Sequence, residues 1–183
     1  MSETQAFGRL VAGLSPWLGQ LVFVGGWAFR LYRLHPSADV PAYRPVVTLD
    51  ADVAFAEGER LEGSIRARLL DTGFVESLMG NHRPPVSQYT LGDDASGFYA
   101  EFLTPLTGSG RRRDGEPMAT VAKAGVTAQR LRHLDLLLEA PWPVTLGADW
   151  GVAPDTSVRV PNPASFIAQR LLIHDQRLPA KKA

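Results

Sequence analysis

The hydrophobic pattern of this chain switches repeatedly between helical and strand spacing, and these switches restrict the fold more than any other feature. Apolar residues recur at helical spacing over 3–18, and the short apolar run at 21–24 predicts a buried strand. A second helical pattern covers 27–34 and ends before His35-Pro36, because the residue before a proline avoids helical geometry. Elements in this order predict an α+β or mixed α/β fold in which helices flank a mixed β-sheet.

The remainder of the chain predicts further strands and helices. Alternating or β-branched segments indicate strands at 46–55, 74–78, 86–91 and 98–106, and a late hairpin from 144–147 and 158–161. Helical spacing indicates helices at 58–73, 129–138 and 163–176. The 183 residues contain no internal repeat, so we predict one domain over 1–183, with 120–183 as a C-terminal extension of helix and hairpin.

Charge and composition exclude several classes of protein. Lys+Arg (19) and Asp+Glu (19) balance to a formal net charge of zero, so the overall charge favours neither nucleic acid nor a membrane surface. The absence of cysteine excludes disulfides and cysteine nucleophiles. The N-terminal segment lacks the pattern of a secretory signal, and the longest apolar stretch, Leu21–Phe29, is too short to span a bilayer. We therefore expect a soluble, cytoplasmic protein without a membrane partner.

Two aspartates interrupt the apolar strand predicted at 46–55. Asp50 and Asp52 are two residues apart, so both side chains leave the same face of a strand. Two carboxylates on one buried face repel each other and are costly to desolvate, and a divalent cation between them removes both problems. Hard oxygen ligands suit Mg²⁺. The alternative is an exposed edge strand that carries two aspartates on its solvent face.

Two further sequence features accompany the aspartate pair. The strand at 21–24 runs into Gly25-Gly26 and then a helix, a tight turn whose backbone N–H groups can meet an anion. Glu101 lies in the apolar strand at 98–106. A third carboxylate would complete a two-metal site for phosphoryl transfer. The alternative is an ordinary turn and a glutamate that faces solvent.

These motifs resemble a known family. The segments FVGGWAFRLY and TLDADVAF are similar to the nucleotidyltransferase fold of the DNA polymerase beta superfamily, whose pattern is a Gly-Gly or Gly-Ser turn followed by an acid-x-acid strand. Four downstream segments resemble a bacterial, mostly uncharacterised branch of that superfamily: TGF, FYAEFLTPL, QRLRHLDLLLE and VRVPNPASFIAQRLL. The resemblance covers most of the chain, from about Leu21 to Leu178.

The resemblance implies an activity and a set of site residues. Asp50 and Asp52 would hold two Mg²⁺ ions, with Glu101 as the third acid. Gly25 and Gly26 would cradle the β- and γ-phosphates of a nucleoside triphosphate. An acceptor hydroxyl would attack the α-phosphate and release pyrophosphate.

Five other residues are candidates for contact with the nucleotide. Arg170 lies where the branch usually has a basic residue that contacts the triphosphate. Arg111 and Arg112 lie in an arginine-rich loop that either grips phosphates or an RNA acceptor, or is simply solvated. Thr48 begins the acidic strand and either contacts nucleotide or reflects β-propensity. Trp27 follows the glycines directly.

Three departures from the superfamily pattern bear on activity. Trp27 stands where a serine or threonine is common, which removes one hydroxyl contact to phosphate. Glu101 stands where the branch generally has aspartate, and the segment between Gly26 and Asp50 is longer than in minimal members.

We therefore predict a Mg²⁺-dependent nucleotidyltransferase whose acceptor is RNA, protein or a small molecule. Related enzymes include toxins of toxin–antitoxin systems, so an antitoxin is one candidate partner. The first alternative is an inactive nucleotide-binding or partner-binding module, in which Trp27 fills part of the phosphate site. The second is a purely structural domain.

Overall fold

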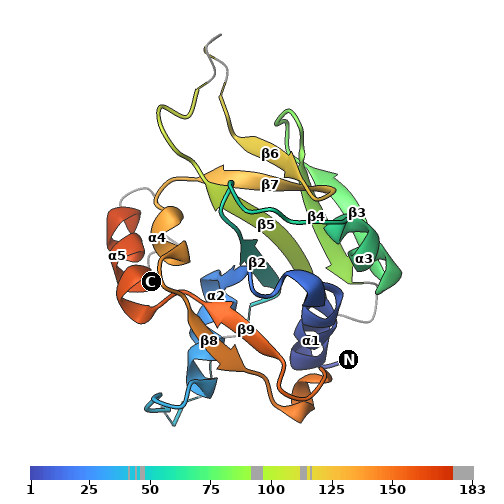
Figure 1. The fold of residues 1–183 in the computed structure, drawn as a ribbon, viewed down its shortest axis with the longest axis vertical. Coiled ribbons are helices and arrows are strands. Elements are labelled where there is room, and N and C mark those ends of the chain that lie inside the picture. The colour runs from blue at the N-terminus through green and yellow to red at the C-terminus, as the bar shows by residue number, and fades with distance from the viewer. Residues whose placement is uncertain are drawn as a thin grey trace.

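The computed structural model describes residues 1–40, 42–43, 45, 48–91, 97–111, 115 and 117–174 (Figure 1). The α-helices are α1 (Glu3–Gly13), α2 (Gly25–Leu31), α3 (Ile65–Asp71), α4 (Asp135–Leu138) and α5 (Pro163–Leu172). The strands are β1 (Val22–Val24), β2 (Asp50–Ala54), β3 (Phe74–Met79), β4 (Val86–Leu91), β5 (Tyr99–Pro105), β6 (Thr120–Lys123), β7 (Val126–Leu131), β8 (Trp142–Thr145) and β9 (Ser157–Val160). Short 3-10 helices lie at Ser15–Trp17, Tyr32–Leu34 and Ala148–Trp150.

Seven strands form one mixed sheet, which confirms the predicted α+β fold with helices on a mixed sheet. Along the main path the strand order is β1-β2-β5-β4-β3, and β2 runs parallel to β5 while the other neighbours on this path are antiparallel. Two strands pair with the edge of β5 that faces away from β2. Strand β4 pairs with residues 99–101, and β7 pairs in parallel with residues 103–105. The sheet therefore forks beyond the middle of β5.

The two faces of the sheet pack against different parts of the chain. Alternation along β2 directs Ala51 and Val53 into the large core, which also contains residues of α1, α2 and α3. The opposite face carries a smaller apolar cluster, in which α4 contributes Leu137 and α5 contributes Phe166 at its edge. Figure 1 shows α4 and α5 together at the side of the molecule away from α1 and α3. The acids of β2 belong to the face that carries the smaller cluster.

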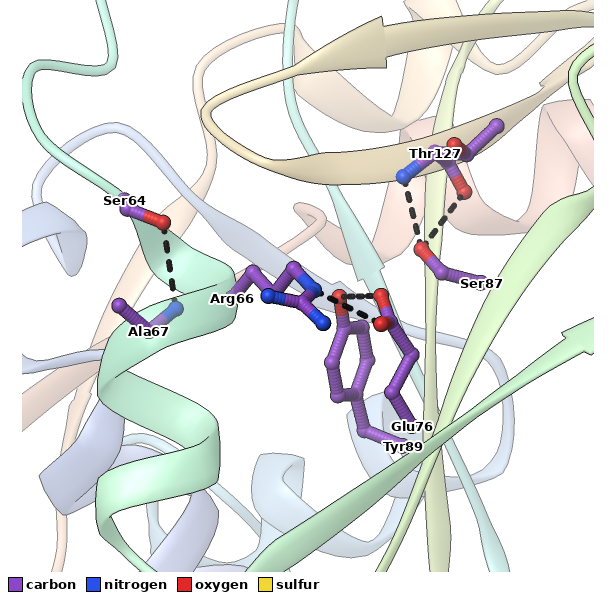
Figure 2. Close-up of polar contacts among 7 residues, drawn as sticks. All are labelled: Ser64, Arg66, Ala67, Glu76, Ser87, Tyr89 and Thr127. Carbon is purple, nitrogen blue, oxygen red and sulfur yellow. Dashed lines mark hydrogen bonds and ion pairs between the residues drawn. The ribbon is translucent and has the colours of Figure 1, made fainter.

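Helix α3 is fastened to the sheet by polar contacts on the large-core side (Figure 2). Ser64 caps the helix, because its hydroxyl accepts a hydrogen bond from the N–H of Ala67 at 3.1 Å. Arg66, the second residue of the helix, donates to Glu76 of β3 at 2.7 Å, and Glu76 also accepts from the hydroxyl of Tyr89 at 2.8 Å. Burial and the hydrogen bond to Glu76 both raise the pKa of Tyr89.

Two predicted helices are wrong in extent or type. The helix predicted over 58–73 begins only at Ile65, because Gly63 has a φ of +81° and Ser64 then caps the first turn. The helix predicted over 129–138 is wrong for its first part, since Gln129 lies in β7 and only α4 is helical. Pairing of β7 with both β5 and β6 outweighs the helical propensity of this segment.

The C-terminal third is divided between the main sheet and a separate hairpin. Residues 120–131 form β6 and β7 of the seven-stranded sheet, and the expected late hairpin is present as β8 and β9. Helix α5 then follows β9, as the closing helical pattern predicts. The assignment of 120–183 as an extension of one domain stays a prediction.

Candidate functional site

The strand register brings the three predicted acids to one face of the sheet. Asp52 pairs directly with Glu101, on the neighbouring parallel strand, and Asp50 pairs with Tyr99. Residues that pair across two strands share a face, and so do residues two apart on one strand. Asp50, Asp52 and Glu101 therefore project from the same face, and all three are half-buried.

The position of β2 is incompatible with one alternative interpretation of the sequence. An exposed edge strand was one explanation for two aspartates in an apolar segment. However, β2 lies between β1 and β5 and pairs with both. Two carboxylates on an internal strand carry a desolvation cost that an edge strand would avoid. The edge-strand explanation of the aspartate pair is therefore wrong.

Apolar residues cover one end of this face and leave the acidic end outside the cluster. Val22 and Val24 of β1, Ala54 of β2 and Leu103 of β5 pack against Leu134 and Leu137 at α4. Asp50 lies beyond this cluster at the other end of β2, and Asp52 pairs with Val24 at the edge of the cluster. The face is thus divided into an apolar part and an acidic part, and the boundary lies at Asp52.

The Gly-Gly turn is in contact with the acidic strand. Gly25 has a φ of +67°, and a Cβ atom built there would overlap Oδ2 of Asp52. A Cβ atom at Gly26 would lie 2.7 Å from Oγ1 of Thr48 and even closer to the methyl group of that residue. Both glycines are therefore required by close packing against the residues predicted as their neighbours in the site. Helix α2 includes both glycines and so begins earlier than predicted.

Glu101 is held by a residue that the sequence analysis did not identify. Nε2 of Gln88, on β4, donates a hydrogen bond to Oε1 of Glu101 at 2.9 Å. Among the described residues, no group of three or more His, Asp or Glu side chains is arranged to hold a metal ion. The acids share a face, but in this conformation Glu101 is engaged with Gln88.

Tyr99 is a second residue that the sequence analysis missed. Its pKa is raised, first by partial burial and then by the negative charges of Asp50, Glu101 and Asp52. This phenol is therefore close to all three predicted acids. The sequence contained one indication of this. Tyr99 lies two residues before Glu101 on the same predicted strand, so both side chains leave the same face.

Trp27 lies in the large core rather than in the candidate phosphate site. Its side chain is 1% exposed and stacks on Phe7, with ring centroids 4.2 Å apart and an interplanar angle of 15°. The indole therefore does not occupy the space beside Asp52, and only the backbone of Trp27 remains as a candidate contact. The apolar positions Trp27, Ala28 and Leu31 indicate this buried helix face in the sequence.

Two of the predicted arginines, Arg111 and Arg170, contact Gly115 and Phe166, respectively. Arg111 lies beyond the C-terminal end of β5, whereas the acids lie in the first half of the paired strands, and its guanidinium donates to the carbonyl of Gly115 at 2.9 Å. Arg170 lies over the ring of Phe166, 4.9 Å from its centroid, and its charge acts on Tyr32. Arg112 lies outside the described residues.

The internal strand pair with three carboxylates on one face, next to a glycine turn that requires glycine, defines an α+β protein with a candidate phosphoryl-transfer site. The family model described as "Nucleotidyltransferase" matches residues 2–183. The chain belongs to this nucleotidyltransferase family.

No curated protein matches the chain, and no solved structure matches it. Within the ranges that the structure describes, no helix is both long and apolar enough to cross a bilayer.

Proposed function

We propose that this protein is a Mg²⁺-dependent nucleotidyltransferase that moves a nucleoside monophosphate from a nucleoside triphosphate to an acceptor hydroxyl. Family membership supports transfer chemistry in general. The observation that carries the specific site is the register, which pairs Asp52 with Glu101 and sets Asp50 on the same face. A purely structural domain would not need this arrangement on an internal strand.

The chemistry of the three acids supports a magnesium site. Carboxylate oxygens from two adjacent strands are hard ligands of the kind that Mg²⁺ prefers. Because β2 is an internal strand, a bound cation would stabilise the negative charges of its carboxylates. Asp50, Asp52 and Glu101 would hold the metal, and the hydrogen bond from Gln88 to one carboxylate oxygen would orient Glu101 for this role. Two bound Mg²⁺ ions would supply charge neutralisation and would lower the pKa of the acceptor hydroxyl.

The glycine side of the acids is the proposed place for the triphosphate. Gly25 and Gly26 allow backbone to approach Asp52 and Thr48 without side-chain bulk. Their N–H groups and the hydroxyl of Thr48 would bind phosphate oxygens. The hydroxyl of Thr48 would then replace the serine or threonine contact that Trp27 does not provide.

The acceptor would approach from the other side of the acids, over β5 and β4. Tyr99 and Gln88 flank the acids there. The acceptor hydroxyl would attack the α-phosphate, the bond to the β-phosphate oxygen would break, and pyrophosphate would leave. RNA, a protein and a small molecule all remain candidate acceptors. The bacterial branch, a cytoplasmic location and an antitoxin partner remain predictions.

Incubation with each α-labelled nucleoside triphosphate and Mg²⁺ tests the proposal. We expect transfer of label to an acceptor, or release of pyrophosphate. Asp50→Asn and Asp52→Asn should each lower this activity by at least about 100-fold, because loss of even an outer-shell partner of a metal ligand costs about 10- to 100-fold. The matched control is Asp71→Asn, since Asp71 is exposed at the end of α3. Equal activity in the control and in Asp52→Asn would refute the assigned site.

One observation favours a binding module as the second candidate. The hydrogen bond from Gln88 holds Glu101, and a third acid so engaged leaves only the aspartate pair for metal. Such a protein would bind nucleotide and Mg²⁺ without turnover. Calorimetric titration with a non-hydrolysable nucleoside triphosphate, alongside the labelling assay, separates the two candidates. The burial of Trp27 in the core removes the earlier reason for this alternative, because the indole does not fill the phosphate site.

A further inference from the structure

The outer strands of the main sheet differ sharply in how they are protected. At one end, all three residues of β1 are buried, and β9 lies alongside. Beyond β7, the outer strand is β6. It has only four residues, and its Lys123 donates to the backbone carbonyl of Glu57. At the other end, β3 has six residues, and among the described strands it pairs only with β4. Its second edge offers backbone N–H and C=O groups for pairing.

Strand β3 also lacks the side chains that usually block edge pairing. Edge strands are commonly protected by proline, lysine, a bulge or very short length. The sequence FVESLM contains neither proline nor lysine. Val75 is 61% exposed, Leu78 is 62% exposed and Met79 is 46% exposed. A strand of this length with exposed apolar side chains on both faces is expected to pair with another chain.

The single charge of β3 is already neutralised within its own chain. Glu76 accepts hydrogen bonds from Arg66 at 2.7 Å and from Tyr89 at 2.8 Å (Figure 2). The carboxylate is directed toward α3, not outward from the strand edge. Two copies of β3 can therefore approach each other without placing two unpaired carboxylates in contact.

We propose that the protein forms a two-fold symmetric dimer in which β3 pairs antiparallel with β3 of a second copy, centred on Ser77. Symmetric antiparallel pairing matches residues of the same face, so the centre must fall on a residue. Centring on Ser77 sets Val75 opposite Met79 of the second copy, twice, which forms two apolar pairs. Centring on Glu76 would instead set Val75 opposite Ser77 of the second copy, and both Val75–Met79 pairs would be lost.

The dimer would join two seven-stranded sheets into one and set both acidic sites on the same side. Asp52, Glu101, Gln88 and Ser77 are successive partners across β2, β5, β4 and β3. Seven strand spacings of about 4.8 Å would therefore separate the two Asp52 residues, roughly 34 Å before sheet twist. The inference rests on the exposed edge and does not depend on the proposed activity.

Cysteine cross-linking tests both the dimer and its register, because the chain has no cysteine of its own. Directly opposed residues of antiparallel strands have Cα atoms about 4.5–5.5 Å apart, which suits a disulfide. Ser77→Cys should therefore form a symmetric disulfide dimer under mild oxidation. Val75→Cys is the matched control, since two copies of residue 75 would lie about 13 Å apart along the strands, too far for a disulfide. Leu171→Cys, on the exposed face of α5, reports random collision.

The mass in solution gives an independent test on unmodified protein. Light scattering across a concentration series should approach twice the mass of the chain. Val75→Lys should shift the protein toward the single-chain mass, whereas Leu171→Lys, a control at another exposed apolar residue, should not. Circular dichroism checks that both variants are folded. A single-chain mass for the wild type throughout the series would overturn the proposal. So would cross-linking of Ser77→Cys no greater than that of either cysteine control.

Discussion

Gly25 is the residue that links the turn to the acids. Its φ of +67° is a backbone conformation that other residues adopt only with strain, and its Cα faces Oδ2 of Asp52. The two requirements are independent, because one concerns the backbone and the other concerns space. A glycine at this position therefore sets how closely the turn approaches Asp52.

Gly25→Ala should destabilise the protein by about 2 kcal/mol or more, since positive φ alone costs a non-glycine residue about 1–2 kcal/mol. The overlap with Asp52 adds to this cost and should lower any transfer activity. Urea unfolding measures the free energy of unfolding. Gly58→Ala is the control, because a Cβ atom there would meet nothing within 4 Å. Equal stability of the two variants would contradict this account.

Gln88 determines where the carboxylate of Glu101 points. Gln88→Leu removes the donor at 2.9 Å, and we expect transfer activity to fall about 10-fold or more, as for the loss of a group that orients a metal ligand. The control is Thr90→Val, because Thr90 lies on the same face of β4 and pairs with Tyr99 instead. Steady-state rates over a Mg²⁺ titration provide the measurement. Activity equal to or above that of the wild type would show that the hydrogen bond does not position Glu101 for the reaction.

At the scale of elements, one buried serine connects β4 and β7, the two strands that separate at the fork in the sheet. Where β4 and β7 separate beside β5, Oγ of Ser87 accepts a hydrogen bond from the N–H of Thr127 at 2.7 Å (Figure 2). The same hydroxyl lies 3.3 Å from the carbonyl of Thr127 and donates to it. Ser87 is 1% exposed, so no water replaces these contacts readily.

Ser87→Ala should therefore cost about 1–3 kcal/mol, the range for a buried polar group that loses its partner. The change removes one oxygen and leaves the N–H of Thr127 without this hydrogen-bond partner. Thermal or urea unfolding measures the loss. Ser37→Ala, at an exposed site, is expected to change stability by no more than about 0.5 kcal/mol. A cost for Ser87→Ala within that smaller range would mean that water enters the fork.

At the scale of the whole molecule, three tyrosines link folding to alkaline pH. The pKa values of Tyr32, Tyr89 and Tyr99 are all raised above the ordinary value of 10.0, chiefly by burial. Above pH 10 the unfolded chain therefore loses these protons before the folded chain does. The stability that they contribute is fully present below the unfolded pKa of 10.0 and is lost as the pH rises through the folded values.

We expect the free energy of unfolding to fall steeply above about pH 10 and to show no tyrosine-linked change below about pH 9. Absorbance of tyrosinate should appear at higher pH in the native protein than in urea. Tyr89→Phe should lessen the alkaline loss, since it removes one of the three groups. It should also cost about 1 kcal/mol at neutral pH through the hydrogen bond to Glu76. A native titration that matches the denatured one would contradict the raised pKa values.

The sequence alone determined the local elements of this site. Period-two alternation placed Asp50 and Asp52 on one face, and the strand, glycine pair and helix were readable because each depends on neighbouring residues. The fold class followed from the order of these elements. The helix predicted over 129–138 failed where pairing with distant strands decided the structure of Gln129.

Tertiary packing determines which residues meet. Asp52 and Glu101 are far apart in the chain, and no local pattern states that β2 and β5 align at that pair; packing of both sheet faces sets the register. The same packing turned Trp27 into the core, placed Arg111 beyond the opposite end of β5, and brought Gln88 to Glu101. A chain encodes the direction of a side chain within its own element, whereas its partner depends on how whole elements pack.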